Sequence, residues 1–243
     1  MTLSLISDER QPLTEPLLQA TGILGSWFLI YTFAELARVF VLGAYQILAL
    51  PIENPTLQNI RLYYFRQIIL LVSFDILISI ILAITALKSR NWGKALNDSL
   101  VTKTGTPLII HSIFRILGDV YILSVINPLV DALLLKTIDP NYELPNEMEY
   151  IINTSRLFDL ATLIFGFIAF CFLGYILIFV SEHYKAFRPI KLSGILLLLG
   201  AFLLLTEFGG IIIVLGAFLA GRRMRKICIV EKRKPSLSIY PYT

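Results

Sequence analysis

The sequence predicts an all-α fold, a polytopic membrane helix bundle, on three observations. Of its 243 residues, 56% are hydrophobic and only 16% are charged, whereas a soluble domain carries about 25% charged residues. The mean hydropathy is +0.76. Several apolar stretches also reach the roughly 18 consecutive residues that indicate a membrane-spanning helix.

Four stretches are expected to cross the membrane in full, and they cover residues 22–50, 67–87, 107–135 and 158–181. Prolines mark two of the boundaries. Pro51 and Pro55 follow the first stretch, and Pro107 opens the third, where a proline in the first helical turn removes no hydrogen bond.

The charges of the connecting segments predict the orientation, because cytoplasmic loops carry an excess of Lys and Arg. The loops after the second and fourth stretches and the segment GRRMRKICIVEKRK are basic, whereas the loop after the third is acidic, with Asp139, Glu143, Glu147 and Glu149. We therefore expect a multi-pass protein of the cell membrane with cytoplasmic N- and C-termini. It would comprise a polar arm (1–21), the bundle (22–221) and a basic tail (222–243).

Residues 192–221 form a fifth apolar region, too long for one ordinary span and too short for two. Since both of its ends are expected in the cytoplasm, we predict a short helical hairpin, which brings the number of membrane segments to six. The segment TEFGG would be its turn, because Gly209 and Gly210 permit a backbone reversal. The alternative is one long helix, kinked at the two glycines, with the tail outside.

Six charged residues interrupt the apolar stretches at one expected depth: Glu35, Arg38, Asp75, Arg115, Asp119 and Glu207. An ionised side chain at the centre of a bilayer costs roughly 2.5–3.5 kcal/mol on insertion scales. We therefore predict that these six side chains face the interior of the bundle as an intramembrane polar network, paired or lining water.

Helical spacing predicts two local pairs within this set. Glu35 can meet Arg38, and Arg115 can meet Asp119, which leaves Asp75 and Glu207 without local partners. Three interpretations remain open: polar contacts that fix helix packing, a path for protons, ions or substrate, or a wrong assignment of depth.

A spacing of 84 residues separates Glu35 from Asp119 and Asp75 from Asp159. This spacing is consistent with a parallel internal repeat, as in some transporters, or with chance similarity between apolar sequences.

No motif of a soluble-type catalytic site is present. The chain has no Walker A, GxGxxG, HExxH or GxSxG pattern, so we expect no catalytic residues, no metal and no cofactor. A basic cluster at Arg222, Arg223, Arg225 and Lys226 is expected to bind anionic headgroups at the membrane surface, and it would also attract nucleic acid.

The segment LSGILLLLGAFLLLTEFGGIIIVLGAFLAG resembles the short C-terminal hairpins of uncharacterised archaeal polytopic membrane proteins. In size, span count and lack of soluble domains, the chain is similar to the membrane subunit of the Ced-type DNA-import system. This resemblance implies a membrane pore that imports DNA with a separate cytoplasmic ATPase.

No loop is long enough to form a domain, so the function is expected within the membrane or in assembly with partners. We predict a non-enzymatic channel or translocation subunit of a larger membrane complex. Its expected partners are the lipid bilayer, other membrane subunits, a cytoplasmic ATPase and, from the basic cluster and the resemblance, nucleic acid. The alternatives are a structural subunit or a lipid-acting or redox enzyme subunit.

Overall fold

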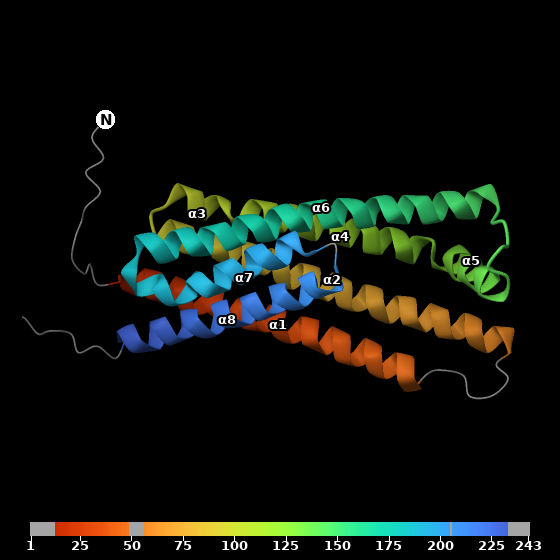
Figure 1. Ribbon diagram of the computed structural model, residues 1–243, viewed down its shortest axis with the longest axis horizontal. Coiled ribbons are helices and arrows are strands. Elements are labelled where there is room, and N and C mark those ends of the chain that lie inside the picture. Colours follow the sequence, from red (N-terminus) through yellow and green to blue (C-terminus); the bar gives the residue numbers. More distant parts are fainter. Residues whose placement is uncertain (1–12, 49–55, 205, 233–243) are drawn as a thin grey trace, which may run out of the picture.

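The computed structural model describes residues 13–48, 56–204 and 206–232, and it contains only helices and their connections in these ranges (Figure 1). The elements are α1 (Glu15–Leu48), α2 (Leu57–Ala95), α3 (Ser99–Lys103), α4 (Gly105–Ser124), α5 (Ile126–Ile138), α6 (Asn146–His183), the 3-10 helix η1 (Lys185–Ile190), α7 (Lys191–Phe202) and α8 (Glu207–Lys232).

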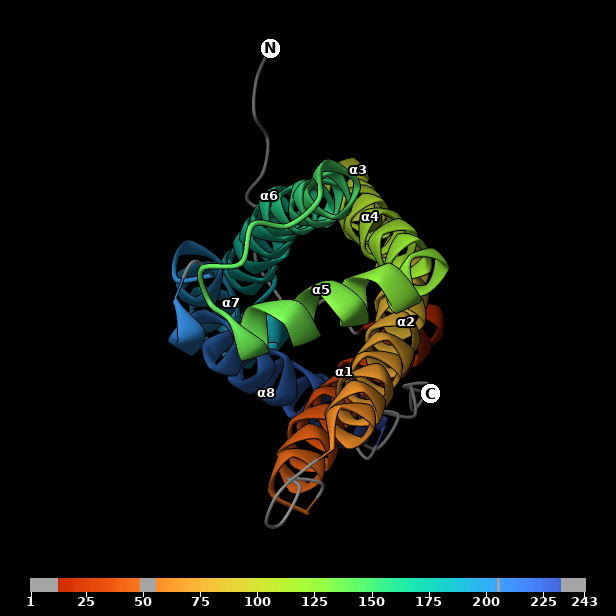
Figure 2. The ribbon, with the colours of Figure 1, turned by 90° about the vertical axis from the view of Figure 1, so that its right-hand side faces the viewer.

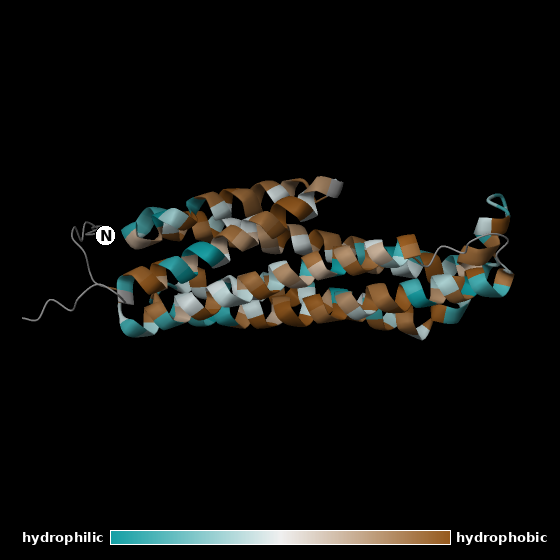
Figure 3. Ribbon diagram, turned by 90° about the horizontal axis from the view of Figure 1, so that it is seen from below, coloured by the Kyte–Doolittle hydropathy of each residue, from teal (hydrophilic) through white to brown (hydrophobic). Residues whose placement is uncertain are grey.

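Four helical segments of the described residues are long and apolar enough to cross a membrane: α1, α2, the stretch Ser99–Ser124 and α6. The predictions of an all-helical chain and of four long apolar spans are therefore confirmed. Figure 3 shows hydrophobic residues along the middle of the bundle and hydrophilic residues concentrated toward its ends, which is the pattern that a bilayer requires.

Helices form a ring when the described part of the bundle is viewed along its length (Figure 2). Neighbours in the ring pack against each other in the order α1, α2, α4, α6, α7 and α8, and α8 closes the ring on α1. Helix α5 lies across one end of this ring. An ion pair between Arg61 and Asp131, at 2.7 Å, and a hydrogen bond between the Tyr64 and Thr137 hydroxyls, at 2.9 Å, join α5 to α2.

The prediction of one continuous span over residues 107–135 is wrong. The helix breaks at Val125, and α5 begins at the next residue with a changed direction. Pro128 explains the break, because its ring would clash with the carbonyl of Ser124 in a continuous helix. In the first turn of a new helix, the missing N–H of proline needs no partner.

The predicted polar arm and basic tail are both shorter than expected. Helix α1 begins at Glu15, and Thr21 is fully buried, where its hydroxyl accepts a hydrogen bond of 3.0 Å from Trp92 Nε1. The boundary at residue 22 is therefore wrong for residues 15–21, which belong to the bundle. Helix α8 likewise continues to Lys232. Residues 1–12 and 233–243 lie outside the described part of the chain.

Helices α7 and α8 lie side by side (Figure 1), with α7 ending at Phe202 and α8 beginning at Glu207. Gly209 and Gly210 belong to α8, so the prediction that they form the turn is wrong by a few residues. Gly209 instead permits a close approach: a Cβ atom there would lie 2.2 Å from the Leu203 carbonyl oxygen. That this pair of helices enters and leaves the membrane on one face stays a prediction.

Glycines let the α7–α8 pair pack closely against the long helices on both sides. A Cβ atom at Gly221 of α8 would lie 2.6 Å from the carbonyl oxygen of Gly25 in α1, and one at Gly194 of α7 would lie 2.6 Å from that of Gly174 in α6. Small residues allow such contacts between membrane helices, which associate through packing because lipid removes the hydrophobic drive.

We expect Gly221→Ala to lower the free energy of unfolding by about 1–3 kcal/mol, because the added methyl group forces α8 away from α1. Thermal unfolding in detergent measures this effect. Gly43→Ala is the control, since a Cβ atom at Gly43 would meet nothing within 4 Å. Equal unfolding temperatures for Gly221→Ala and the unmodified protein would contradict the close α1–α8 contact.

Candidate functional site

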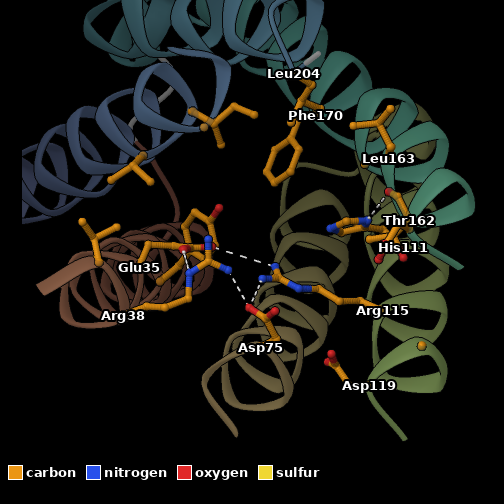
Figure 4. A pocket seen from close by; sticks show the side chains of 18 of the residues that line it. Glu35, Arg38, Asp75, His111, Arg115, Asp119, Thr162, Leu163, Phe170 and Leu204 are labelled. Atoms are coloured by element: carbon orange, nitrogen blue, oxygen red, sulfur yellow. Dashed lines mark hydrogen bonds and ion pairs between the residues drawn. The ribbon is translucent and has the colours of Figure 1, made fainter. Parts of the chain in front are cut away.

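Asp75 of α2 lies at the centre of a charged cluster inside the bundle (Figure 4). Its Oδ1 atom accepts hydrogen bonds from Arg38 Nη1 of α1 and Arg115 Nη2 of α4, both at 2.5 Å. One carboxylate thus joins three helices. Asp75 was predicted to lack a partner on its own helix, and the partners that the structure shows come from the two neighbouring helices.

Glu35 completes this cluster from α1. Its Oε2 atom lies 3.3 Å from Arg38 Nε, and its Oε1 atom lies 3.9 Å from Arg115 Nη1. The four side chains are between 11% and 27% exposed. Two carboxylates therefore face two guanidinium groups, so the formal charges of these four residues balance.

The pairing explains how charged side chains lie within the membrane bundle. An unpaired charge in hydrocarbon costs several kcal/mol, whereas paired and hydrogen-bonded groups offset much of that cost. These contacts also fix the relative positions of α1, α2 and α4. For these four residues, the geometry supports the interpretation that polar contacts hold the packing of the helices.

A cavity of about 580 Å³ adjoins the charged cluster. The cluster and other polar side chains line one side of it, and apolar side chains line much of the rest (Figure 4). The polar and aromatic lining residues are Tyr31, Glu35, Arg38, Asp75, His111, Arg115, Asp119, Phe158, Asp159, Thr162 and Phe170. The apolar lining residues include Leu36, Val39, Ile122, Leu163, Leu204, Ile211, Ile213 and Val214.

Asp119 lines this cavity without joining the ion pairs. It is 5% exposed, and its Oδ2 atom accepts no hydrogen bond from any described residue. The predicted pairing with Arg115 is wrong, because that guanidinium group is directed to Asp75 and Glu35 instead. Figure 4 shows Asp119 beside the cluster on the cavity side of its helix. A buried carboxylate with an unsatisfied oxygen is costly, so Asp119 calls for a functional explanation.

Two further polar residues, His111 and Asp159, line the cavity although the sequence did not single them out as site residues. His111 is buried, and its Nδ1 atom lies 3.1 Å from the Thr162 carbonyl oxygen. Asp159 was placed at the outer boundary of a span starting at residue 158, but α6 begins at Asn146, which puts Asp159 well inside the helix. The spacing of 84 residues was a usable signal, since Glu35, Asp75, Asp119 and Asp159 all line this cavity.

The remaining predicted site residues are Gly210, Glu207 and the basic cluster. Gly210 lines the cavity, and a Cβ atom there would meet nothing within 4 Å. Glu207 is the first residue of α8, but its side chain lies outside the described part of the structure. The basic cluster lies far from the cavity, in the C-terminal part of α8 at the end of the bundle where α1 begins; it comprises Arg222, Arg223, Arg225 and Lys226.

The exposed lining residues show where the cavity opens. Val39 of α1 and Ile211 of α8 are 63% and 67% exposed, and Asp159 of α6 and Gly210 of α8 are also exposed. These residues come from α1, α6 and the tip of the α7–α8 pair. Because that pair ends about half-way along the bundle (Figure 1), the opening lies beyond its tip, between α1 and α6.

The described residues contain no group of three or more His, Cys, Asp or Glu side chains that could hold a metal ion. Comparison of the chain with known protein families, curated proteins and solved structures finds no match. The site is therefore interpreted from its own geometry.

We expect Asp75→Asn to lower the free energy of unfolding by about 3 kcal/mol, because it leaves two partly buried guanidinium groups without their common carboxylate. Asp131→Asn is the matched control. Asp131 also pairs with an arginine, but its side chain is 40% exposed, so its loss should cost about 1 kcal/mol or less. Both variants are measured by unfolding in detergent, and equal losses for the two would contradict the central role of Asp75.

Proposed function

We propose that this protein is a transport component of the cell membrane and that its cavity admits a small polar or charged solute. One observation carries the proposal: a buried carboxylate, Asp119, lines a cavity inside the membrane bundle without a partner among the described residues. Polar and ionisable side chains within membrane helices characteristically mark substrate or ion pathways.

The paired cluster alone does not account for the site. Contacts that only fix helix packing need neither an additional carboxylate nor an adjacent open volume, since packed interfaces exclude voids. Asp119 and the cavity are the features that a purely structural subunit would lack.

The distribution of charge supports an orientation for the proposed transport. Basic residues from the C-terminal part of α2, from η1 and from α8 gather at the end of the bundle where α1 begins, whereas the acidic loop between α5 and α6 lies at the other end. By the positive-inside rule, the basic end faces the cytoplasm. The described chain then begins and ends on that side, and α7 and α8 would form a short hairpin that enters from there, for a total of six membrane segments.

The length of α7 supports the hairpin. Its 12 residues extend about 18 Å at 1.5 Å per residue, which is less than the ~30 Å hydrocarbon core. Helix α7 thus reaches only part of the way across the membrane.

The size of the cavity favours a small solute over the DNA that the overall layout implies. Its volume of about 580 Å³ falls within the usual range for sites that bind a small molecule. A nucleic acid would need a passage formed elsewhere, between copies of this chain or with partner subunits.

A structural subunit of a membrane complex is the second candidate, and the balanced ion-pair cluster that joins α1, α2 and α4 favours it. In that case, disrupting the cavity would leave any solute flux unchanged, and disrupting the cluster would impair assembly.

We expect Gly210→Trp to abolish solute flux, because the indole fills the open volume that adjoins Gly210. The protein is reconstituted into liposomes, and efflux of trapped inorganic ions, amines and carboxylates is compared between variants. Gly43→Trp is the control, since Gly43 also has free space around it but does not line the cavity.

Thermal unfolding of each variant separates a blocked cavity from a misfolded protein. Protein-dependent flux that Gly210→Trp removes, with Gly43→Trp unaffected, is the expected result. Absence of flux for every solute, or flux that both folded variants retain, would overturn the transport proposal.

A further inference from the structure

More carboxylate groups than guanidinium groups line the cavity. The two arginines are already engaged by Glu35 and Asp75. Asp119 and Asp159 line the same cavity, and the Oδ2 atom of Asp119 accepts no hydrogen bond from any described residue. A cation bound between them would supply the missing partner.

Aromatic side chains surround the same space. Tyr31 of α1 and Phe158 and Phe170 of α6 line the cavity, and Tyr31 and Phe170 are each only 5% exposed. The face of an aromatic ring attracts an organic cation, and the attraction strengthens when the site excludes water. The acids and rings together therefore suit an ammonium-type cation better than an inorganic ion.

The remaining lining suits apolar substituents on such a cation. Leu163, Ile213 and Val214 line the cavity from α6 and α8, and Ile213 is 2% exposed. A small hydrophilic ammonium ion would leave these side chains without contact, whereas a lipophilic cation would cover them.

The position of the opening gives such a ligand a route from the bilayer. The exposed lining residues Val39, Asp159 and Ile211 lie on the three elements around the gap beyond the tip of the α7–α8 pair. Among the described helices, α7 and α8 stop short of this level (Figure 1), so an opening there would face sideways, toward the space that lipid occupies around a membrane bundle.

From these observations we propose that the cavity binds a lipophilic monovalent organic cation, which enters from the bilayer between α1 and α6 and pairs with Asp119. This inference rests on the proposed transport function, because it names the class of solute for the same cavity. Asp159, at the opening, is the first carboxylate that an entering cation meets.

The test uses tetraphenylphosphonium as the probe and the full-length protein in nanodiscs of zwitterionic lipid. Equilibrium dialysis against empty nanodiscs measures saturable binding. We expect Asp119→Asn to weaken the affinity by about tenfold or more, since it removes the buried charge that pairs with the cation. Asp159→Asn should weaken it less, because Asp159 is exposed. Glu143→Gln, an exposed change in the loop between α5 and α6, should leave it unchanged.

Neutral triphenylphosphine oxide controls for partition into lipid, and it should show no saturable binding and no response to Asp119→Asn. The proposal is overturned if tetraphenylphosphonium binds no more than to empty nanodiscs, if the neutral compound binds equally well, or if folded Asp119→Asn retains full affinity. If Asp119→Asn does not fold, Gly210→Trp takes its place, and unchanged affinity in that variant would equally overturn the proposal.

The binding measurement requires no transport, so the transport proposal and the cation proposal can be rejected independently of each other. Saturable cation binding without any flux that responds to Gly210→Trp would reject the transport function and leave the cation site standing. Flux of other solutes without cation binding would reject only the cation.

Discussion

The contact of Asp75 with Arg38 and Arg115 is the interaction on which the rest of the structure depends. Within a bilayer, a charged side chain must be paired or must line a polar space, and this constraint decides which faces of α1, α2 and α4 turn inward. A single carboxylate joins two guanidinium groups from neighbouring helices at 2.5 Å, and these contacts constrain how the three helices lie against one another.

In the other half of the ring, close packing positions α7 and α8. Helices α7 and α8 approach α6 and α1 through glycine contacts, and they end about half-way along the bundle (Figure 1). The position of the tip that they share leaves the cavity open beyond it and brings Gly210 to the cavity lining. The same protein thus combines a tightly paired polar cluster with an unpaired carboxylate, Asp119, that faces open volume.

Composition and periodicity predicted the helical class and the four long apolar spans, because long apolar stretches are visible in sequence. Helical spacing within one chain segment predicted the wrong ion-pair partner for Arg115. Helical spacing favoured pairing of Arg115 with Asp119, but the contact between helices with the partly buried carboxylate of Asp75 overrides local spacing. The break at Val125 and the start of α6 at Asn146 were also missed, since an apolar sequence gives little sign of where a helix changes direction or how far it extends beyond the bilayer.

A double-mutant cycle on Asp75 and Arg115 tests the account most directly, with the free energy of reversible unfolding in mixed micelles as the quantity measured. The account predicts that Asp75→Asn and Arg115→Gln are strongly coupled, so that the double variant loses about 1–3 kcal/mol less than the sum of the two single losses. Additivity within about 0.5 kcal/mol would show that the two side chains act independently, and the central role given to this contact would be contradicted.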